Sequence, residues 1–494
     1  MIRLRIIIFL LVIMTLVASI KSVNTAVAKD EKPDLTIAMK EGRDQNFRLL
    51  VHKYMVKTGK KVELIIYPKD ESQNTRVYTE LLSGRGPDLI QGTDFAYWTL
   101  AECGALVDIA ELMENDPDIN INDFFQNIVD PFKDEEGHLY IMPCSFLFLF
   151  VIVNHELFEK VGMSIPEEWT YESFLQTCIK YTELSEKPLN TAALNGNGDI
   201  YILRETEREL VSAIDFRNKT SYLNELDNTV FECLAGLSNI SKISDSYYNI
   251  SPYLFFSVYM QLDNYKYFKY IIENNDCEVR NLPRSKYREG EYLFEPIYSM
   301  SINKAGNVDE AWQFLKYLLS EEVQTGTIDS YSPGDNLIWN PVNKKAAEKR
   351  IELIRKQAYE HAEYAKKGRG SFLYDTKHSP DKFMKQVDRC IELYISLRDA
   401  LTTPIISDDT LKESLVFAIK QETGKNFNVT KLRNELSRIV DVYMSEEGGD
   451  LQSGYTNIYI IFSVTIGISV FTVLFSTLKR KKVKHAPSGV EKGE

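Results

Sequence analysis

The chain has 494 residues, of which 44% are hydrophobic, so it is long enough to bury more than one hydrophobic core. Its 71 acidic residues outnumber its 58 basic residues and give a formal net charge of −13, which argues against binding to nucleic acid. The six cysteines are scattered, with no closely spaced pair and no histidine cluster. A structural zinc site is therefore not supported, whereas disulfide pairing is left open.

The N-terminus is typical of a secretory signal peptide over residues 1–28. Arg3 and Arg5 form a basic region, residues 6–20 are apolar, and Ala26-Val27-Ala28 provides small residues for cleavage. An uncleaved anchor is the alternative, but the apolar core is short for a membrane span. The first cysteine is Cys103, so an N-terminal lipid anchor is not expected.

The chain then alternates between strand and helix patterns. Residues 35–39 and 61–67 indicate two strands, separated by a helix whose apolar residues share one face, and residues 87–90 lead into a third strand. This alternation predicts an α/β fold with a mainly parallel sheet. Because ligands of such sheets bind beyond the carboxyl ends of the strands, the loops 40–44, 68–74 and 92–98 are candidate binding loops.

Two of these loops carry residues suited to a sugar. The first begins with Lys40 and Glu41, and the third combines one carboxylate with three aromatic rings. Aromatic rings stack on the C–H faces of sugars, while carboxylates accept hydrogen bonds from hydroxyl groups. The candidates in the third loop are Asp94, Phe95, Tyr97 and Trp98. Tyr97 and Trp98 could instead begin a helix and pack into the core.

A long apolar run at residues 144–153 predicts a strand that is buried on both faces. Its start supplies three further candidate ligand-binding residues, Ser145, Phe146 and Phe148. Thr170 follows as the predicted cap of a helix, with Ser173 completing only part of a capping box.

A strand, a helix and a turn follow in a recognisable order. Residues 298–303 predict a strand, and Asp309 is the expected N-cap of a helix over 310–319. Asn340-Pro341-Val342-Asn343 comes after a polar loop. Tyr298 and Trp339 are candidate ligand-binding residues in this region. An amphipathic helix that ends near Tyr443 closes the folded part.

The C-terminal end predicts a membrane anchor. Residues 446–455 form a polar linker, and the uncharged apolar segment 456–478 is long enough to cross a hydrocarbon core of ~30 Å. The tail 479–494 begins with a basic cluster, which places it in the cytoplasm and the rest of the chain outside the cell. A single-pass protein of the cell membrane with an extracellular domain is therefore expected.

Several of these motifs together resemble the family 1 extracellular solute-binding proteins, which are maltose-binding-protein-like receptors of ABC importers. The motifs are Gly84-Arg85-Gly86-Pro87-Asp88, Gly104 to Asp108, Gly137 to Pro143, Pro166 to Phe174, and Tyr298 to Asn343. The resemblance implies a two-lobed periplasmic-binding-protein type II fold with an interdomain cleft. It assigns residues 29–147 with 300–342 to one lobe and 148–299 with 343–445 to the other.

The resemblance also implies a function. The chain would bind a solute, such as a sugar or oligosaccharide, as a monomer without a cofactor, and deliver it to ABC permease subunits. Phe146-Leu147-Phe148 stands where many sugar-binding relatives have a polar residue, which allows a ligand with a larger apolar face. A sensor ectodomain and a surface enzyme acting on glycosides are the alternatives. The sequence has no HExxH, GxSxG, Walker or GxGxxG motif for an enzyme.

Overall fold

The computed structural model describes residues 32–42, 44–68, 71–95, 97–195, 201–215, 220–237, 253–260, 277–287, 291–326, 338–367, 380–404, 409–422 and 427–448. The predicted signal peptide, membrane span and basic tail lie outside these ranges. Among the residues described, no helix combines the length and the apolar composition that a membrane crossing needs.

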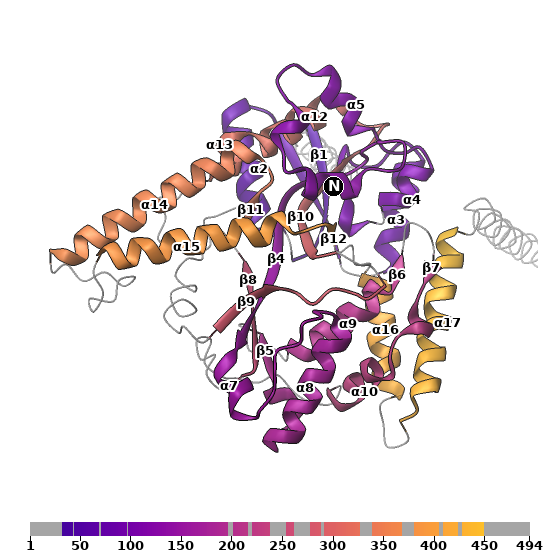
Figure 1. Cartoon of the computed structure of the whole chain (residues 1–494). Coiled ribbons are helices and arrows are strands. Elements are labelled where there is room, and N and C mark those ends of the chain that lie inside the picture. Colours follow the sequence, from indigo (N-terminus) through magenta and orange to yellow (C-terminus); the bar gives the residue numbers. More distant parts are fainter. Residues whose placement is uncertain are drawn as a thin grey trace, which may run out of the picture.

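The described part is an α/β fold in which strands and helices alternate along the chain (Figure 1). The strands are β1 (Leu35–Lys40), β2 (Val62–Tyr67), β3 (Leu89–Gln91), β4 (Met142–Asn154), β5 (Ala193–Asn195), β6 (Ile214–Asp215), β7 (Thr220–Ser221), β8 (Phe255–Met260), β9 (Cys277–Asn281), β10 (Leu293–Ile302), β11 (Asn340–Pro341) and β12 (Thr403–Pro404). The α-helices are α2 (Asp44–Thr58), α3 (Glu71–Leu82), α4 (Tyr97–Glu102), α5 (Ile109–Asn115), α6 (Gln126–Val129), α7 (His155–Lys160), α8 (Tyr171–Ser185), α9 (Tyr201–Ser212), α10 (Asn228–Leu237), α12 (Val308–Leu319), α13 (Glu321–Thr325), α14 (Lys344–Lys366), α15 (Pro380–Asp399), α16 (Asp409–Glu422) and α17 (Val429–Gly448). Short 3-10 turns are η1 (Gly92–Asp94), η2 (Ile121–Asp123), η3 (Asp130–Phe132), η4 (Leu189–Thr191) and η5 (Leu223–Glu225).

A parallel unit of three strands begins the fold. β1 pairs in parallel with both β2 and β3, as the alternating sequence pattern predicts. Ile37 and Met39 point into one hydrophobic cluster, whereas Ala38 packs in another on the opposite face. The central strand is therefore buried on both faces, with α2 and α12 among the helices that cover it.

Two long strands join this unit to a second one. The first half of β4 pairs antiparallel with β10, and its second half pairs with β8 and β9. Within the described residues the sheet order is β2-β1-β3-β10-β4-β8-β5. β4 has 13 residues, and every one except Asn154 is buried. Both cores are therefore built on the same continuous strand, as the apolar run in the sequence predicts.

The second hydrophobic core lies around β5 and β8. α8, α9, α10, α16 and α17 contribute its buried side chains. The predicted cap of α8 is confirmed and is more complete than expected. The Thr170 hydroxyl accepts a hydrogen bond from the Ser173 amide, and the Ser173 hydroxyl accepts one from the Thr170 amide.

Helices α14 and α15 form a long hairpin that extends away from the rest of the molecule (Figure 1). Their buried residues, such as Ile354 and Tyr394, belong to the first hydrophobic cluster, whereas those of α16 and α17 belong to the second. The sequence-based division placed all of residues 343–445 with the second lobe. The first cluster also contains residues of β8 such as Phe256 and Met260, so this division stays a prediction.

Three local expectations are corrected or resolved. The N-cap of α12 is Asn307, whose side chain accepts from the Glu310 amide, and Asp309 lies in the first turn instead. α17 continues to Gly448, three residues into the predicted linker. All six cysteines, which are described, are free thiols.

Candidate functional site

The carboxyl ends of the parallel strands meet the two strands that connect the cores. β1 ends at Lys40 and β3 at Gln91, and Gln91 is in register with Met300 of β10. β10 runs antiparallel to β3, so residues before Met300 extend beyond this edge of the sheet toward the second core. We call this place, where residues 143–147 pair with residues 295–299, the crossing. Ligands of parallel α/β sheets bind at such an edge.

The predicted residues of the first loop lie at this edge. The Lys40 side chain is buried, and its Nζ lies 5.8 Å from the centroid of the Phe95 ring. Glu41 is exposed. Phe95 is fully buried, and its ring meets that of Tyr67 edge to face at 5.7 Å between centroids. This packing gives Phe95 a structural role, and its contact with a ligand stays a prediction.

The third loop tightens into η1 before α4 begins. Gly92 is required here, because a Cβ atom would come within 2.4 Å of the Ser301 hydroxyl on β10. Asp94 ends η1, but its side chain lies outside the described part. Tyr97 and Trp98 both begin α4, with their rings 5.4 Å apart. Both are half-buried, and Tyr97 packs against two of the hydrophobic clusters. The ligand-binding roles of Tyr97 and Trp98 stay predictions.

The candidates at the start of β4 are all buried. The Ser145 hydroxyl donates to the carbonyl of Asn340 at 3.2 Å and accepts from the Trp339 amide at 3.0 Å. The structure thus brings Ser145 and Trp339 together, and the Trp339 side chain is half-buried. Phe146 and Phe148 point to the same side of the strand, 6.2 Å apart, and both pack in the first cluster. Their ligand-binding role also stays a prediction.

Tyr298 lies in the crossing with an unusual backbone. Its φ is +52° although the residues on either side, Ile297 and Ser299, pair with β4 as extended strand. Its ring packs against Phe47 at 5.2 Å, and the residue is 4% exposed. A non-glycine residue with positive φ inside a strand is strained, and such strain concentrates at functional positions.

The sequence reasoning missed a cluster of charged residues on the other side of the crossing. Arg208 of α9 donates to Glu295 of β10 at 2.7 Å, and its Nε lies 3.2 Å from Glu205. Arg204, one turn earlier, donates to the Tyr259 hydroxyl of β8 at 2.6 Å. Arginines four residues apart share a helix face, so this spacing was a signal that could have indicated the cluster.

Burial perturbs one carboxyl of this cluster. Glu205 is fully buried, and the loss of hydration raises its pKa to about 7. The positive charges of the nearby Arg208 and Arg204 guanidinium groups lower this pKa, but by less than burial raises it. Glu295 is partly exposed and is in register with Leu147 of β4. The cluster therefore lies directly beside the crossing.

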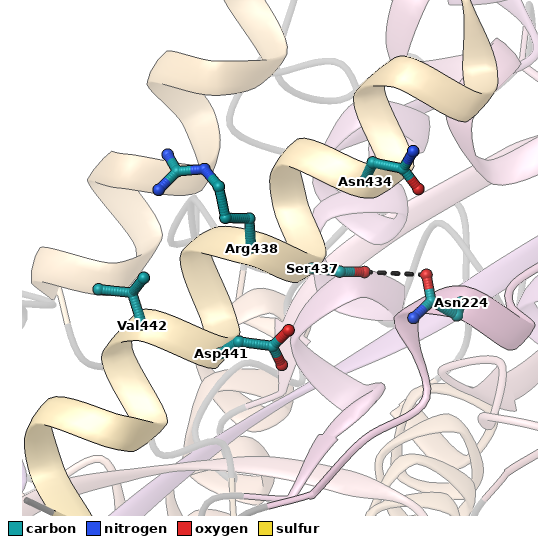
Figure 2. A pocket seen from close by; sticks show the side chains of 6 residues that line it. All are labelled: Asn224, Asn434, Ser437, Arg438, Asp441 and Val442. Atoms are coloured by element: carbon teal, nitrogen blue, oxygen red, sulfur yellow. Dashed lines mark hydrogen bonds between the residues drawn. The ribbon is translucent and has the colours of Figure 1, made fainter.

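Two hollows among the described residues lie elsewhere. One of about 610 Å³ is lined by the C-terminal half of α2 and by α12. α2 starts at the carboxyl edge of the sheet and runs back along it, so this hollow lies toward the opposite edge. The other, of about 420 Å³, is an open hollow over α17, where Ser437 donates to Asn224 at 3.0 Å (Figure 2). Neither hollow contains a predicted site residue.

In the described ranges, no three His, Cys, Asp or Glu residues are grouped so that they could hold a metal ion.

This geometry defines an α/β protein in which two hydrophobic cores share two long strands, with candidate binding residues at the crossing. The family model of the bacterial extracellular solute-binding proteins matches residues 41–217. The match confirms the family resemblance that the sequence motifs predict.

Solved structures share the fold. The chain is similar to the sugar-binding protein MalE of the phytopathogen Xanthomonas citri, with a TM-score of 0.51 and 11% identity over 83% of this chain and 97% of that one. It is equally similar to a putative oligosaccharide periplasmic-binding protein of a Synechococcus species, with a TM-score of 0.51 and 11% identity over 83% and 99% of the two chains. These likenesses show a two-lobed α/β fold. No curated protein matches the sequence.

Proposed function

We propose that this chain is the extracellular receptor of an ABC import system, and that it binds a carbohydrate between its two lobes by hinge closure. It passes the solute to permease subunits without transforming it. Segment 456–478 anchors it to the cell membrane, with the tail 479–494 in the cytoplasm and the receptor outside.

The crossing is the observation that carries this proposal. Within the described residues, β10 pairs with β3 and with the first half of β4, and the second half of β4 continues into pairing with β8. Both strands pass through the edge where β1 and β3 end. A ligand there could contact residues of both lobes at once. Such contacts exist only when the lobes are closed, so binding drives closure.

Two further findings support the class of ligand. The structures with the same fold are described as a sugar-binding protein and a putative oligosaccharide-binding protein. Lys40, Glu41 and Trp98 at the carboxyl edge supply the charged groups and the half-buried ring that carbohydrate recognition uses.

A thermal-shift series on the purified chain tests the function. We expect sugars or oligosaccharides to raise the melting temperature, because a ligand that binds only the native state stabilises it by about 2.7 kcal/mol at a hundredfold excess over Kd. Small-angle scattering should then show a smaller radius of gyration with the same ligand. A shift with peptides or polyamines alone would contradict the carbohydrate assignment. Release of a cleaved glycoside would contradict binding without turnover.

The third loop can be tested with the sugar that gives the largest shift. Asp94→Ala and Trp98→Ala should each weaken binding about tenfold in calorimetry, because a ring or a carboxylate contact is lost. The melting temperature of the free protein should change little, since Trp98 is only half-buried. Tyr359→Ala, an exposed aromatic on α14, is the matched control. Unchanged affinity in both loop variants would remove this loop from the site.

A further inference from the structure

One face of α9 presents two arginines to the strands that lead into the crossing, and the two differ in their surroundings. The Arg208 guanidinium has two carboxylates beside it, Glu205 at 3.2 Å and Glu295 at 2.7 Å. The Arg204 guanidinium has a phenol instead. It donates to the Tyr259 hydroxyl at 2.6 Å and lies 5.4 Å from the centroid of the Tyr259 ring.

Within the described part of the chain, the Arg204 guanidinium forms no direct ion pair, although its charge acts at longer range on Glu205. No carboxylate oxygen there lies within 4.0 Å of its guanidinium. A guanidinium has five N–H donors in a planar fork, and the bond to Tyr259 uses one of them. Arg204 is also only partly exposed, so water screens its charge incompletely. A carboxylate matches the geometry and the charge of the remaining donors.

The position of the pair connects it with the candidate site. β5 and β8 run parallel, and Tyr259 is the second-last residue of β8, so it lies at their common carboxyl edge. Tyr259 is in register with Leu149 of β4, four residues after Ser145 in the crossing. The Arg204–Tyr259 pair thus lies at the carboxyl edge of β5 and β8, next to the part of β4 that leaves the crossing.

We propose that Arg204, held in place by Tyr259, binds a carboxylate of the solute, and that the solute is an acidic carbohydrate containing uronic acid residues. This inference rests on the proposed function as a carbohydrate receptor. Tyr259 orients the guanidinium and offers an aromatic face, and Arg204 selects the charged sugar over its neutral counterpart. Arg208, which is ion-paired with Glu295, fixes α9 to β10 and does not select the ligand.

Matched pairs of sugars test this subsite on the full-length protein. The probes are trimers of galacturonate and glucuronate, each compared by calorimetry with the neutral trimer of galactose or glucose. We expect a uronate trimer to bind at least about tenfold more tightly than its neutral partner, with an affinity that falls as salt is raised. Arg204→Gln should abolish both the preference and its salt dependence. Arg204→Lys keeps the positive charge but not the planar set of guanidinium donors, so it should retain part of the uronate preference and of its salt dependence.

The control is Arg355→Gln, an exposed arginine on α14 that is ion-paired with Asp388 and lies outside the candidate site. It should leave the preference unchanged. Uronate and neutral trimers that bind the wild type equally well, or a preference for uronate that survives in Arg204→Gln, would overturn the acidic subsite while leaving the receptor function intact. Binding of neither series would contradict the carbohydrate receptor itself, and the subsite with it.

Discussion

The side chain of Tyr298 stabilises the folded protein, whereas the strained backbone of the same residue destabilises it. The ring is buried against Phe47, whereas the φ of +52° places the backbone in the left-handed region. The strand ladder has no pair at this position, and the carbonyl of the opposite residue, Cys144, accepts a hydrogen bond from the Gln324 side chain at 2.8 Å. Left-handed geometry costs an ordinary residue about 1–2 kcal/mol.

Two substitutions separate these contributions. Tyr298→Ala should lower the free energy of unfolding by about 3–4 kcal/mol, because the buried ring is lost while the strain remains. Tyr298→Gly loses the same ring but relieves the strain, so we expect it to be more stable than Tyr298→Ala by about 1 kcal/mol in urea unfolding. Glycine normally ranks below alanine inside a strand.

Ile297 provides the control because it neighbours Tyr298 and has an ordinary strand backbone. Ile297→Gly should be less stable than Ile297→Ala by about 0.5–1 kcal/mol. If alanine is also the more stable choice at position 298, the strain at Tyr298 is absent in solution.

At the scale of the element, α9 is unusual because its buried face carries two carboxyl groups. Glu205 is fully buried and Glu209 is 2% exposed. Burial raises the pKa of Glu209 to about 8; Lys286 opposes this shift and Glu172 adds to it. Burial likewise raises the pKa of Glu205 to about 7. In the unfolded chain both carboxyls titrate near 4.5, so the folded protein holds protons that the unfolded chain has released.

The stability of the protein should therefore depend on pH through this helix. The favourable contribution of the two protonated carboxyls is complete below about pH 4.5 and is lost as pH rises through about 7 and 8. In Glu209→Gln the amide is neutral at every pH. We expect this variant to be more stable than the wild type at pH 9 by a few kcal/mol, since one pKa unit corresponds to about 1.4 kcal/mol.

Urea unfolding at pH 5 and pH 9 measures the effect. Glu183→Gln, an exposed position on the neighbouring helix α8, should follow the wild type at both pH values. A Glu209→Gln variant that loses as much stability as the wild type between these pH values would show that Glu209 is ionised in the folded protein.

The same helix shows what the sequence could and could not predict. The strands β1, β2 and β4 and the cap of α8 follow from local patterns, because periodicity and capping depend on neighbouring residues. For the cluster around Arg204, the spacing of the two arginines shows that they share a helix face, but no local pattern shows which strands α9 packs against. For the same reason, Phe95 and Phe146 were predicted from residue type as ligand contacts, although both are fully buried in hydrophobic clusters.

At the scale of the whole molecule, the two cores are joined by short segments from distant parts of the chain. Apart from β4 and β10, the link includes β11, which pairs with β4 at residues 145 and 146. Asn340 of β11 is buried, and its amide donates to the carbonyl of Phe146 at 3.0 Å and to that of Met260 at 2.8 Å. Phe146 belongs to the half of β4 that pairs with β10, and Met260 ends β8 on the second sheet. One side chain thus bonds to both sheets.

Asn340 should therefore matter more to global stability than its size suggests. Asn340→Ala leaves two buried carbonyl groups without this donor, and each unsatisfied group costs about 1–3 kcal/mol. We expect the free energy of unfolding to fall by about 2–4 kcal/mol in calorimetry. Because β4 runs through both cores, the whole chain should still unfold in one transition, at a lower temperature. Asn122→Ala, at an exposed asparagine in η2, should change little. An Asn340→Ala variant as stable as Asn122→Ala would show that the two sheets are held together by β4 and β10 alone.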